Sequence, residues 1–175
     1  MQINHTNLEG VIEIQPNLYE DTRGFFMESY NKKLYKDIGI YKNFVQDNIS
    51  ESKKNVLRGF HFQSMKPQGK LVSCLRGKII DVVVDINKDS KQYAQSFFTI
   101  LDSKKQNQLW IPPGYAHGFC VLSDSALFHY KCTDYYDPFD QHGVAWNDQD
   151  INFNWPVDNP ILSEKDKVLP RLKDL

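Results

Sequence analysis

The chain has 175 residues, 41% of them hydrophobic, and its 21 Lys and Arg against 22 Asp and Glu give a formal net charge of -1. This balance, without any block of like charges, argues against a nucleic acid or an anionic membrane as the main partner. Because no apolar run approaches the ~18 residues of a membrane span and MQINHTNLEG lacks a signal-peptide pattern, we expect a cytoplasmic protein with one domain over residues 1–175.

Short strand-like runs, separated by Gly, Pro, Asn, Asp and Ser, dominate the chain. In chain order the predicted strands are VIEIQ, FFMESY, NFVQDNIS, VLRGFHFQ, KLVSCLR, KIIDVVVDI, SFFTILD, QLWI, HGFCVLS and ALFHYKCTDYY. Helical periodicity is nearly absent, and only KKLYKDIG (32–39) and LSEKDKVL (162–169) predict one or two turns each. About ten strands without intervening helices predict an all-β sandwich or barrel with a few short helices.

Three features within these runs lead to local predictions. Arg76-Gly77 lies between two apolar runs and is a hairpin signal. KIIDVVVDI is apolar on both faces, which predicts a central strand in which Asp81 is semi-buried, either hydrogen-bonded or on an outward curl. The cysteines lie singly in apolar runs without C-x-x-C spacing, so we interpret them as core residues rather than disulfide partners or zinc ligands; they are Cys74, Cys120 and Cys132.

The run VLRGFHFQ carries polar side chains where a sheet would bury apolar ones. Strict alternation places His61 and Gln63 on one face of the strand and Arg58 on the other. A glycine inside a strand often marks a bulge, and a bulge at Gly59 would rotate Arg58 onto the face of His61. Regular pairing at Gly59 with Arg58 in solvent is the alternative.

Further polar residues accompany this strand in neighbouring runs. Lys70 follows the loop SMKPQG, Gln46 and Asn48 lie in NFVQDNIS, and His117 lies in IPPGYAHGF. Burying so many polar groups without partners would cost several kcal/mol in total. The set therefore favours a cavity lined for a ligand over a plain core.

Two tyrosines suggest the length of that ligand. Tyr130 and Tyr136 fall on one face of ALFHYKCTDYY and, at roughly 3.3 Å per residue, are about 20 Å apart along a strand. This distance suits a nucleotide-linked sugar better than a single sugar ring. A stripe of aromatic residues is more commonly core, so the spacing alone leaves both readings open.

IPPGYAHGF contains P-x-G-x-x-H, which resembles the second motif of the cupin superfamily of small antiparallel barrels. Many cupins hold a metal with that histidine, an H-x-H pair and a Glu from the first motif. The corresponding stretch GFHFQSMKPQGK supplies only His61. Two histidines without a carboxylate are a poor divalent-metal site, so we predict no catalytic metal.

Seven segments in the same order resemble the dTDP-4-dehydrorhamnose 3,5-epimerase family of metal-free cupin enzymes. They are DTRGFFMESY, QDNIS, VLRGFHFQ, GKLVSCLRGKIIDVVVDI, IPPGYAHGF, YKCTDYY and NWPVDNPILSEKD, and they span about residues 10 to 170. The resemblance implies a cupin-like antiparallel jelly roll without a cofactor. It also implies epimerisation of dTDP-4-dehydro-6-deoxy-D-glucose at C3 and C5, through an enolate, in dTDP-L-rhamnose synthesis.

The resemblance assigns the chemistry to four residues. His61 would be the base, since an imidazole titrates near pH 6.5 and accepts a proton at neutral pH. Asp166 would orient it and stabilise the imidazolium, although an Asp in the charged run SEKD is otherwise expected in solvent. Lys70 would place its ammonium near the C4 oxygen, and Tyr130 would donate a proton from the opposite face of the sugar.

The resemblance further implies a nucleotide site shared across a homodimer. Arg23, Phe26 and Glu28 would reach the thymidine and diphosphate bound in the other subunit, with an arginine suited to phosphate and a carboxylate to the thymine N–H. The remaining substrate-binding residues that it implies are Gln46, Asn48, Arg58, His117 and Tyr136.

Three other functions are weighed against this one. A relative could invert only one carbon or act on another nucleotide sugar, and no residue here separates that case. A sugar-binding cupin without catalysis is disfavoured because His61, Asp166 and Tyr130 are all present. A metal-dependent cupin oxygenase is disfavoured by the missing ligands.

Overall fold

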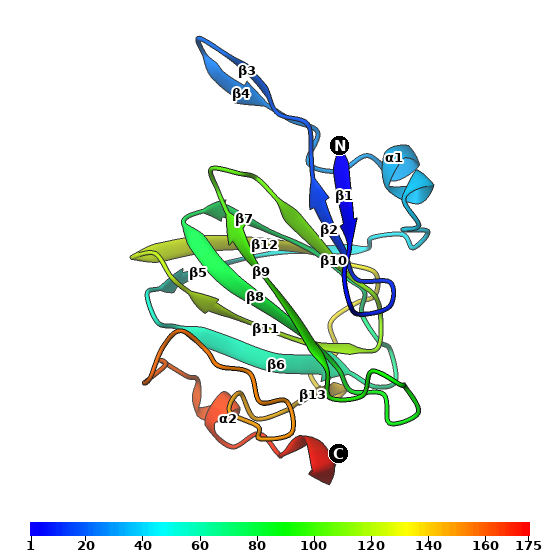
Figure 1. Ribbon diagram of the computed structural model, residues 1–175, viewed down its shortest axis with the longest axis vertical. Coiled ribbons are helices and arrows are strands. Elements are labelled where there is room, and N and C mark those ends of the chain that lie inside the picture. The colour runs from blue at the N-terminus through cyan, green and yellow to red at the C-terminus, as the bar shows by residue number, and fades with distance from the viewer.

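A computed structural model describes residues 1–175 as two facing antiparallel sheets (Figure 1). The first sheet has the order β1 (Gln2–His5), β2 (Ile12–Gln15), β10 (Gln108–Ile111), β7 (Lys70–Arg76), β12 (Ser125–Cys132) and β5 (Gln46–Lys53). The second has the order β13 (Gln141–Gly143), β6 (Leu57–Gln63), β11 (Tyr115–Val121), β8 (Lys78–Asp85) and β9 (Ser96–Asp102). The prediction of an all-β, cupin-like jelly roll is confirmed.

Helical structure is confined to short segments, as the sequence predicts. They are α1 (Lys32–Asp37), α2 (Glu164–Lys167) and a final 3-10 turn (Leu172–Asp174). Asn31 caps α1 by accepting hydrogen bonds from two backbone N–H groups, and Ser163 caps α2 by accepting one from the backbone of Asp166. The cap at Ser163 fixes the single helical turn that carries the buried Asp166.

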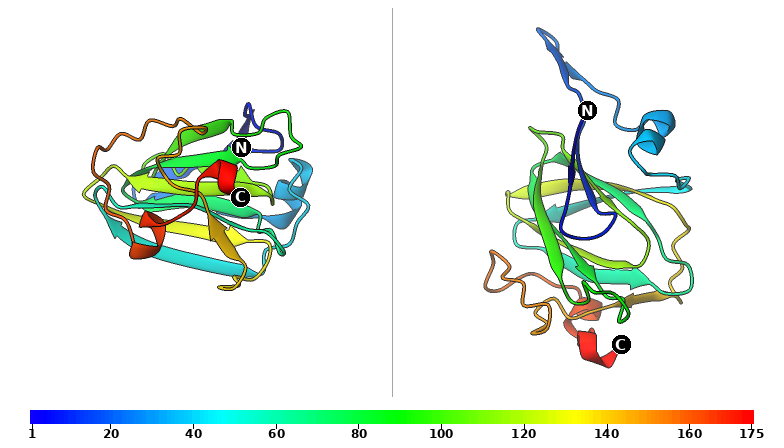
Figure 2. Two further views of the ribbon diagram at one scale, coloured as in Figure 1. Left: turned by 90° about the horizontal axis from the view of Figure 1, so that it is seen from below. Right: turned by 45° about the vertical axis from the view of Figure 1, so that its right-hand side comes forward.

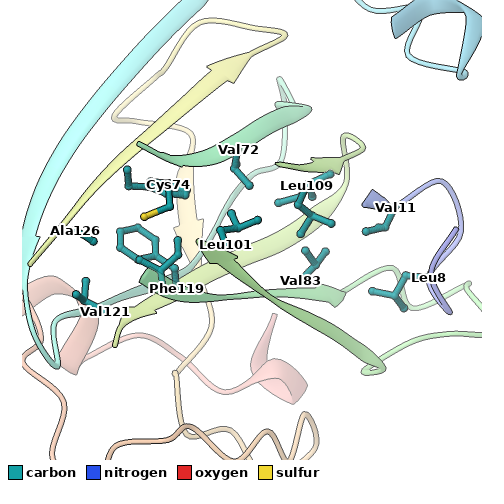
Figure 3. Close-up of a cluster of buried hydrophobic side chains, with 13 residues drawn as sticks. Leu8, Val11, Val72, Cys74, Val83, Leu101, Leu109, Phe119, Val121 and Ala126 are labelled. Atoms are coloured by element: carbon teal, nitrogen blue, oxygen red, sulfur yellow. The ribbon is translucent and has the colours of Figure 1, made fainter. Parts of the chain in front are cut away.

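The main core fills the space between the two sheets, where Val72 and Leu109 of the first sheet meet Val83 and Phe119 of the second (Figure 3). A second apolar cluster includes Ile80, Val82 and Val84 of β8, together with residues of the C-terminal segment. Strand β8 is thus covered on both faces and pairs with β11 and β9, which confirms the predicted central strand. The cysteines are confirmed as buried and free; they are Cys74, Cys120 and Cys132.

The predicted hairpin at Arg76-Gly77 is wrong. Strand β7 pairs with β10 and β12 in the first sheet, whereas β8 pairs with β11 and β9 in the second. Gly77 has a φ of +85°, and a Cβ there would lie 2.2 Å from the Ser125 carbonyl oxygen. The glycine therefore serves a tight crossing between the sheets, which a hairpin signal in the sequence does not distinguish from a hairpin.

A two-stranded hairpin of β3 (Tyr19–Asp21) and β4 (Gly24–Phe26) projects from one end of the molecule, while α2 and the C-terminus lie at the other (Figures 1 and 2). The predicted strand FFMESY is correct only at its start, since β4 ends at Phe26 and irregular chain leads on to α1. Phe25 and Phe26 are both exposed, the latter by 67%. An isolated two-stranded hairpin has little stability of its own, so this arm needs a surface to cover it.

Candidate active site

A cavity of about 350 Å³ lies between the sheets, with walls from β5, β7 and β12 of the first and β6 and β11 of the second. Its lining residues are Gln46, Asn48, Ser50, Arg58, His61, Gln68, Lys70, His117, Phe119, Phe128, Tyr130, Tyr136 and Gln141. The structure thus brings together most of the residues that the sequence singles out. The exceptions are Asp166, which lies behind His61, and Arg23, Phe26 and Glu28.

A bulge in β6 turns Arg58 toward the cavity. His61 pairs with His117 of β11, but Arg58 pairs with Phe119, so the register shifts by one residue between these pairs. Gly59 lies inside the shift with a φ of +125°, and a Cβ there would come within 2.5 Å of Gly118. The predicted bulge is confirmed, and it explains how Arg58 and His61 line one cavity. The Nε of Arg58 donates to the hydroxyl of Ser52 at 3.1 Å.

His61 and Asp166 form a hydrogen-bonded pair at the wall of the cavity. Nε2 of His61 lies 2.6 Å from Oδ1 of Asp166. The imidazole is 25% exposed, whereas the carboxylate is only 4% exposed. A carboxylate accepts and does not donate, so this contact places the ring proton on Nε2 and leaves the lone pair on Nδ1. The pair can therefore take up a proton at Nδ1 while the carboxylate stabilises the resulting imidazolium.

Lys70 and Tyr130 come from the opposite wall, on β7 and β12 of the first sheet. Burial lowers the pKa of Lys70, partly offset by the nearby Cys132 and Asp81. Burial also raises the pKa of Tyr130, with Arg58 opposing the shift. The phenol consequently keeps its proton at neutral pH and is ready to donate it, while the lysine supplies positive charge in a partly desolvated site.

His117 belongs to a second imidazole–carboxylate pair. Its Nε2 lies 3.0 and 2.9 Å from the two oxygens of Asp81, and both side chains are buried. The hydrogen-bonded reading of Asp81 is thus correct, although the residue is fully rather than semi-buried. His117 stacks on Phe128 with 6.1 Å between ring centroids, and both side chains line the cavity.

The tyrosines do not share a strand, contrary to the prediction. Strand β12 ends at Cys132, so Tyr136 lies in the following loop, and the distance along a strand does not apply. Both still line the cavity. The backbone N–H of Tyr136 donates to Gln46 Oε1 at 2.9 Å, and its hydroxyl donates to Gln141 Oε1 at 2.8 Å.

The residues assigned to the nucleotide stand apart from the cavity within one chain. Arg23 lies at the tip of the projecting hairpin, where it pairs with Asp21, and Phe26 ends β4. Glu28 follows the hairpin and accepts a hydrogen bond from the Asn31 amide. Figure 1 shows that the hairpin extends away from the two sheets.

Sequence reasoning missed several cavity residues. Ser50 alternates with Gln46 and Asn48 on β5, so the strand period of two would have found it. Gln141 had no such signal because β13 has only three residues.

An imidazole–carboxylate pair, a phenol and an ammonium line one cavity between the sheets of a jelly roll, and this fold and site define a cupin-like epimerase. The family model for dTDP-4-dehydrorhamnose 3,5-epimerase matches residues 5–174. The chain belongs to this family.

Individual relatives agree with the family model over nearly the whole chain. The chain is 47% identical to the dTDP-4-dehydrorhamnose 3,5-epimerase of Shigella flexneri over 169 residues, which is 95% of this chain and 93% of the relative. It is also 47% identical to the enzyme of that name from Methanothermobacter thermautotrophicus, over 97% of this chain and 93% of the relative. A crystal structure of dTDP-6-deoxy-D-glucose-3,5-epimerase from Legionella pneumophila, in complex with dTDP-4-keto-L-rhamnose, superposes with a TM-score of 0.96 at 45% identity, covering 98% of this chain and 93% of that one.

No group of three or more His, Cys, Asp or Glu side chains comes together in a way that could hold a metal ion. None of the helices has the length and apolar character needed to cross a bilayer. Metal independence and cytoplasmic location themselves stay predictions.

Proposed function

We propose that this chain converts dTDP-4-dehydro-6-deoxy-D-glucose to dTDP-4-dehydro-L-rhamnose by inverting C3 and C5, with His61 as base and Tyr130 as acid. The observation that carries the assignment is the placement of His61 on β6 and Tyr130 on β12, in opposite sheets that enclose one cavity. Inversion requires a proton to leave one face of a carbon and another to arrive on the opposite face. Because the two sheets face each other across the cavity, one can present a base to one face of the carbon and the other can present an acid to the opposite face.

Each inversion starts at the C–H bond beside the C4 ketone. Nδ1 of His61 accepts the proton, the C–H electron pair moves into the ring, and negative charge collects on the C4 oxygen. The ammonium of Lys70 stabilises this enolate, and Asp166 stabilises the imidazolium. Tyr130 then delivers its proton to the other face of the carbon. Exchange with solvent returns a proton to Tyr130 and removes one from His61.

The nucleotide is assigned to residues of a second subunit. Arg23, Phe26 and Glu28 do not line the cavity of their own chain, and the exposed aromatic hairpin needs a covering surface. A symmetric dimer in which each hairpin lies against the partner's cavity meets both requirements. Arg58, Gln46, Asn48, His117 and Tyr136 would complete the substrate site from within the chain.

Hydrogen exchange tests the reaction. The chain is incubated with dTDP-4-dehydro-6-deoxy-D-glucose in deuterated water, and C3 and C5 are read by NMR. Deuterium at both carbons, with an inverted product, supports the 3,5-epimerase. Deuterium at one carbon would identify a monoepimerase, and none would identify a sugar-binding cupin.

Activity in excess chelator tests the predicted independence from metal, and we expect full activity to be retained.

A further inference from the structure

Two loops cross between the sheets next to the cavity, and we name them the rim loops. The first spans residues 64–69 and joins β6 of the second sheet to β7 of the first, so it connects the strand of His61 to the strand that Lys70 begins. The other spans residues 133–140 and joins β12 of the first sheet to β13 of the second, so it connects the strand of Tyr130 to Gln141. The rim loops are therefore direct covalent links between the wall with the base and the wall with the acid.

Gln63 joins the two rim loops through hydrogen bonds of both its amide nitrogen and its amide oxygen. The side chain is only 5% exposed. Its Nε2 donates to the Lys66 carbonyl at 2.9 Å and to the Tyr135 carbonyl at 3.2 Å, and its Oε1 accepts from the Asp137 backbone N–H at 2.9 Å. One partner lies in the first rim loop and two lie in the other.

Asp140 makes the reverse connection from the end of the second rim loop. Its carboxylate is fully buried and accepts hydrogen bonds from the backbone N–H groups of Ser64, Met65 and Lys66 and from the Ser64 hydroxyl, at 2.9 to 3.1 Å. Burial raises the pKa of this carboxyl, but these hydrogen bonds outweigh it and lower the pKa to about 2. The group is therefore charged at neutral pH, and it is matched to three consecutive N–H donors of the other loop.

We propose that Gln63 and Asp140 are positioning residues, which lock the rim loops together and so hold His61 and Tyr130 in the alignment that inversion requires. The inference rests on the proposed function. Neither side chain lines the cavity, so neither needs to touch the substrate. Buried polar groups that are hydrogen-bonded fix a geometry more narrowly than apolar contacts do. Here they join two loops that connect the strands of His61 and Tyr130 to the opposite sheet.

Loss of the Gln63 and Asp140 hydrogen bonds between the rim loops should affect inversion more than hydrogen exchange. His61 alone can remove a proton, exchange it with solvent and return deuterium to the same face of the carbon. Inversion needs His61 and Tyr130 to be correctly placed at the same time across the gap between the sheets. When the two walls are held less rigidly, the ratio of exchange to inversion therefore rises. This ratio is a property of each active molecule and does not depend on the fraction of the protein that is folded.

The test compares Gln63→Leu and Asp140→Asn with the unchanged chain by NMR in deuterated water. Gln63→Leu removes all three loop contacts, whereas Asp140→Asn keeps the size and one acceptor oxygen and carries the test if the first variant is not recovered folded. Gln92→Leu is the matched control, because Gln92 also joins two segments, bonding to the backbone of Asn7 and Glu9 away from the cavity. We expect the ratio of exchange to inversion to rise about tenfold or more in the two rim variants, since a misplacement of about 1 Å can lower a rate on the order of 100-fold. The control should keep the original ratio.

An unchanged ratio in the rim variants, with exchange and inversion falling together, would show that these residues only stabilise the fold and would overturn the inference. An equal rise in Gln92→Leu would overturn it as well. Failure of the proposed function looks different, because then the unchanged chain itself would lack exchange and inversion at C3, at C5 or at both carbons.

Discussion

Nε2 of His61 lies 2.6 Å from Oδ1 of Asp166, although the two residues are 105 positions apart in the chain. The carboxylate sits in the single turn of α2, held by the Ser163 cap, and is almost completely buried. Since this contact fixes the protonated nitrogen of the imidazole, it determines which ring atom can accept a proton from substrate. The imidazole–carboxylate pair is thus assembled from a strand of the second sheet and from the C-terminal segment.

Replacing Asp166 by Asn should strongly reduce turnover. The amide can hydrogen-bond to the ring but supplies no negative charge and favours the wrong tautomer, a change that costs on the order of 10,000-fold in a comparable imidazole–carboxylate pair. Steady-state kcat measures the effect, and circular dichroism checks the fold. Glu164→Gln, at an exposed position of the same turn, should leave kcat unchanged. A kcat for Asp166→Asn close to that of the unchanged chain would show that the pair is not the base.

Replacing Tyr130 by Phe should separate two activities that the unchanged chain combines. Without the hydroxyl, the opposite wall has no proton to deliver, while His61 can still remove a proton and return deuterium to the same face. NMR should therefore show continued exchange beside the ketone with inversion reduced about 100-fold or more. If the variant inverted both carbons at the normal rate, another group would have to be the acid.

The alkaline limb of the pH–rate profile should report Lys70. Burial lowers its pKa, so the ammonium is lost at lower pH than in an ordinary lysine, and stabilisation of the enolate falls as pH rises through that lowered value. Tyr130 has a raised pKa and stays protonated over this range. Lys70→Arg keeps a positive charge at all these pH values and should shift the limb upward in pH, even with a lower maximum rate. If the alkaline limb of Lys70→Arg lay at the same pH as that of the unchanged chain, a group other than Lys70 would cause it.

Acid stability should depend on Asp140. Its pKa is about 2 in the folded chain against an ordinary value of 3.8, so its ionised form stabilises the fold fully above the ordinary value, and this contribution is lost as pH falls toward 2. We expect Asp140→Asn to lower Tm at pH 7 and to lower it much less near pH 2. A Tm difference that stays constant between these pH values would contradict the role of the charge.

Mixing two inactive variants tests the shared nucleotide site. If Arg23 serves the cavity of the partner subunit, a mixed dimer of Arg23→Ala and His61→Ala contains one doubly impaired site and one intact site. Random exchange of subunits in an equal mixture should then restore about a quarter of the original activity at low substrate concentration. No restoration, with native mass spectrometry showing that mixed dimers form, would place Arg23 in the site of its own chain.

The sequence predicts the cavity better than it predicts the contacts behind it. Polar residues inside strand-like runs correctly indicate Gln46 and Asn48, and Gly59 signals the bulge that brings in Arg58. These features are local, since a strand period or a glycine is visible within a few residues. The partner of His61 is not local: the charged run around Asp166 reads as solvent-exposed, and only the family resemblance indicated it.

Long-range pairing also explains the errors. Whether a Gly closes a hairpin or a crossing depends on which sheet the next strand joins, and Arg76-Gly77 carries no information on that. Asp140 reads as a turn residue in DPFD, and its role emerges only because three N–H groups of a distant loop converge on it. Gln141 enters the cavity from a strand too short to be predicted.

The most direct measurement of proton abstraction by His61 is deuterium incorporation at C3 and C5 of dTDP-4-dehydro-6-deoxy-D-glucose, compared between the unchanged chain and His61→Ala. We predict label at both carbons with the unchanged chain and almost none with the variant, whose fold is verified by circular dichroism. Label appearing at an equal rate in both proteins, or an inverted product that carries no solvent deuterium, would contradict it.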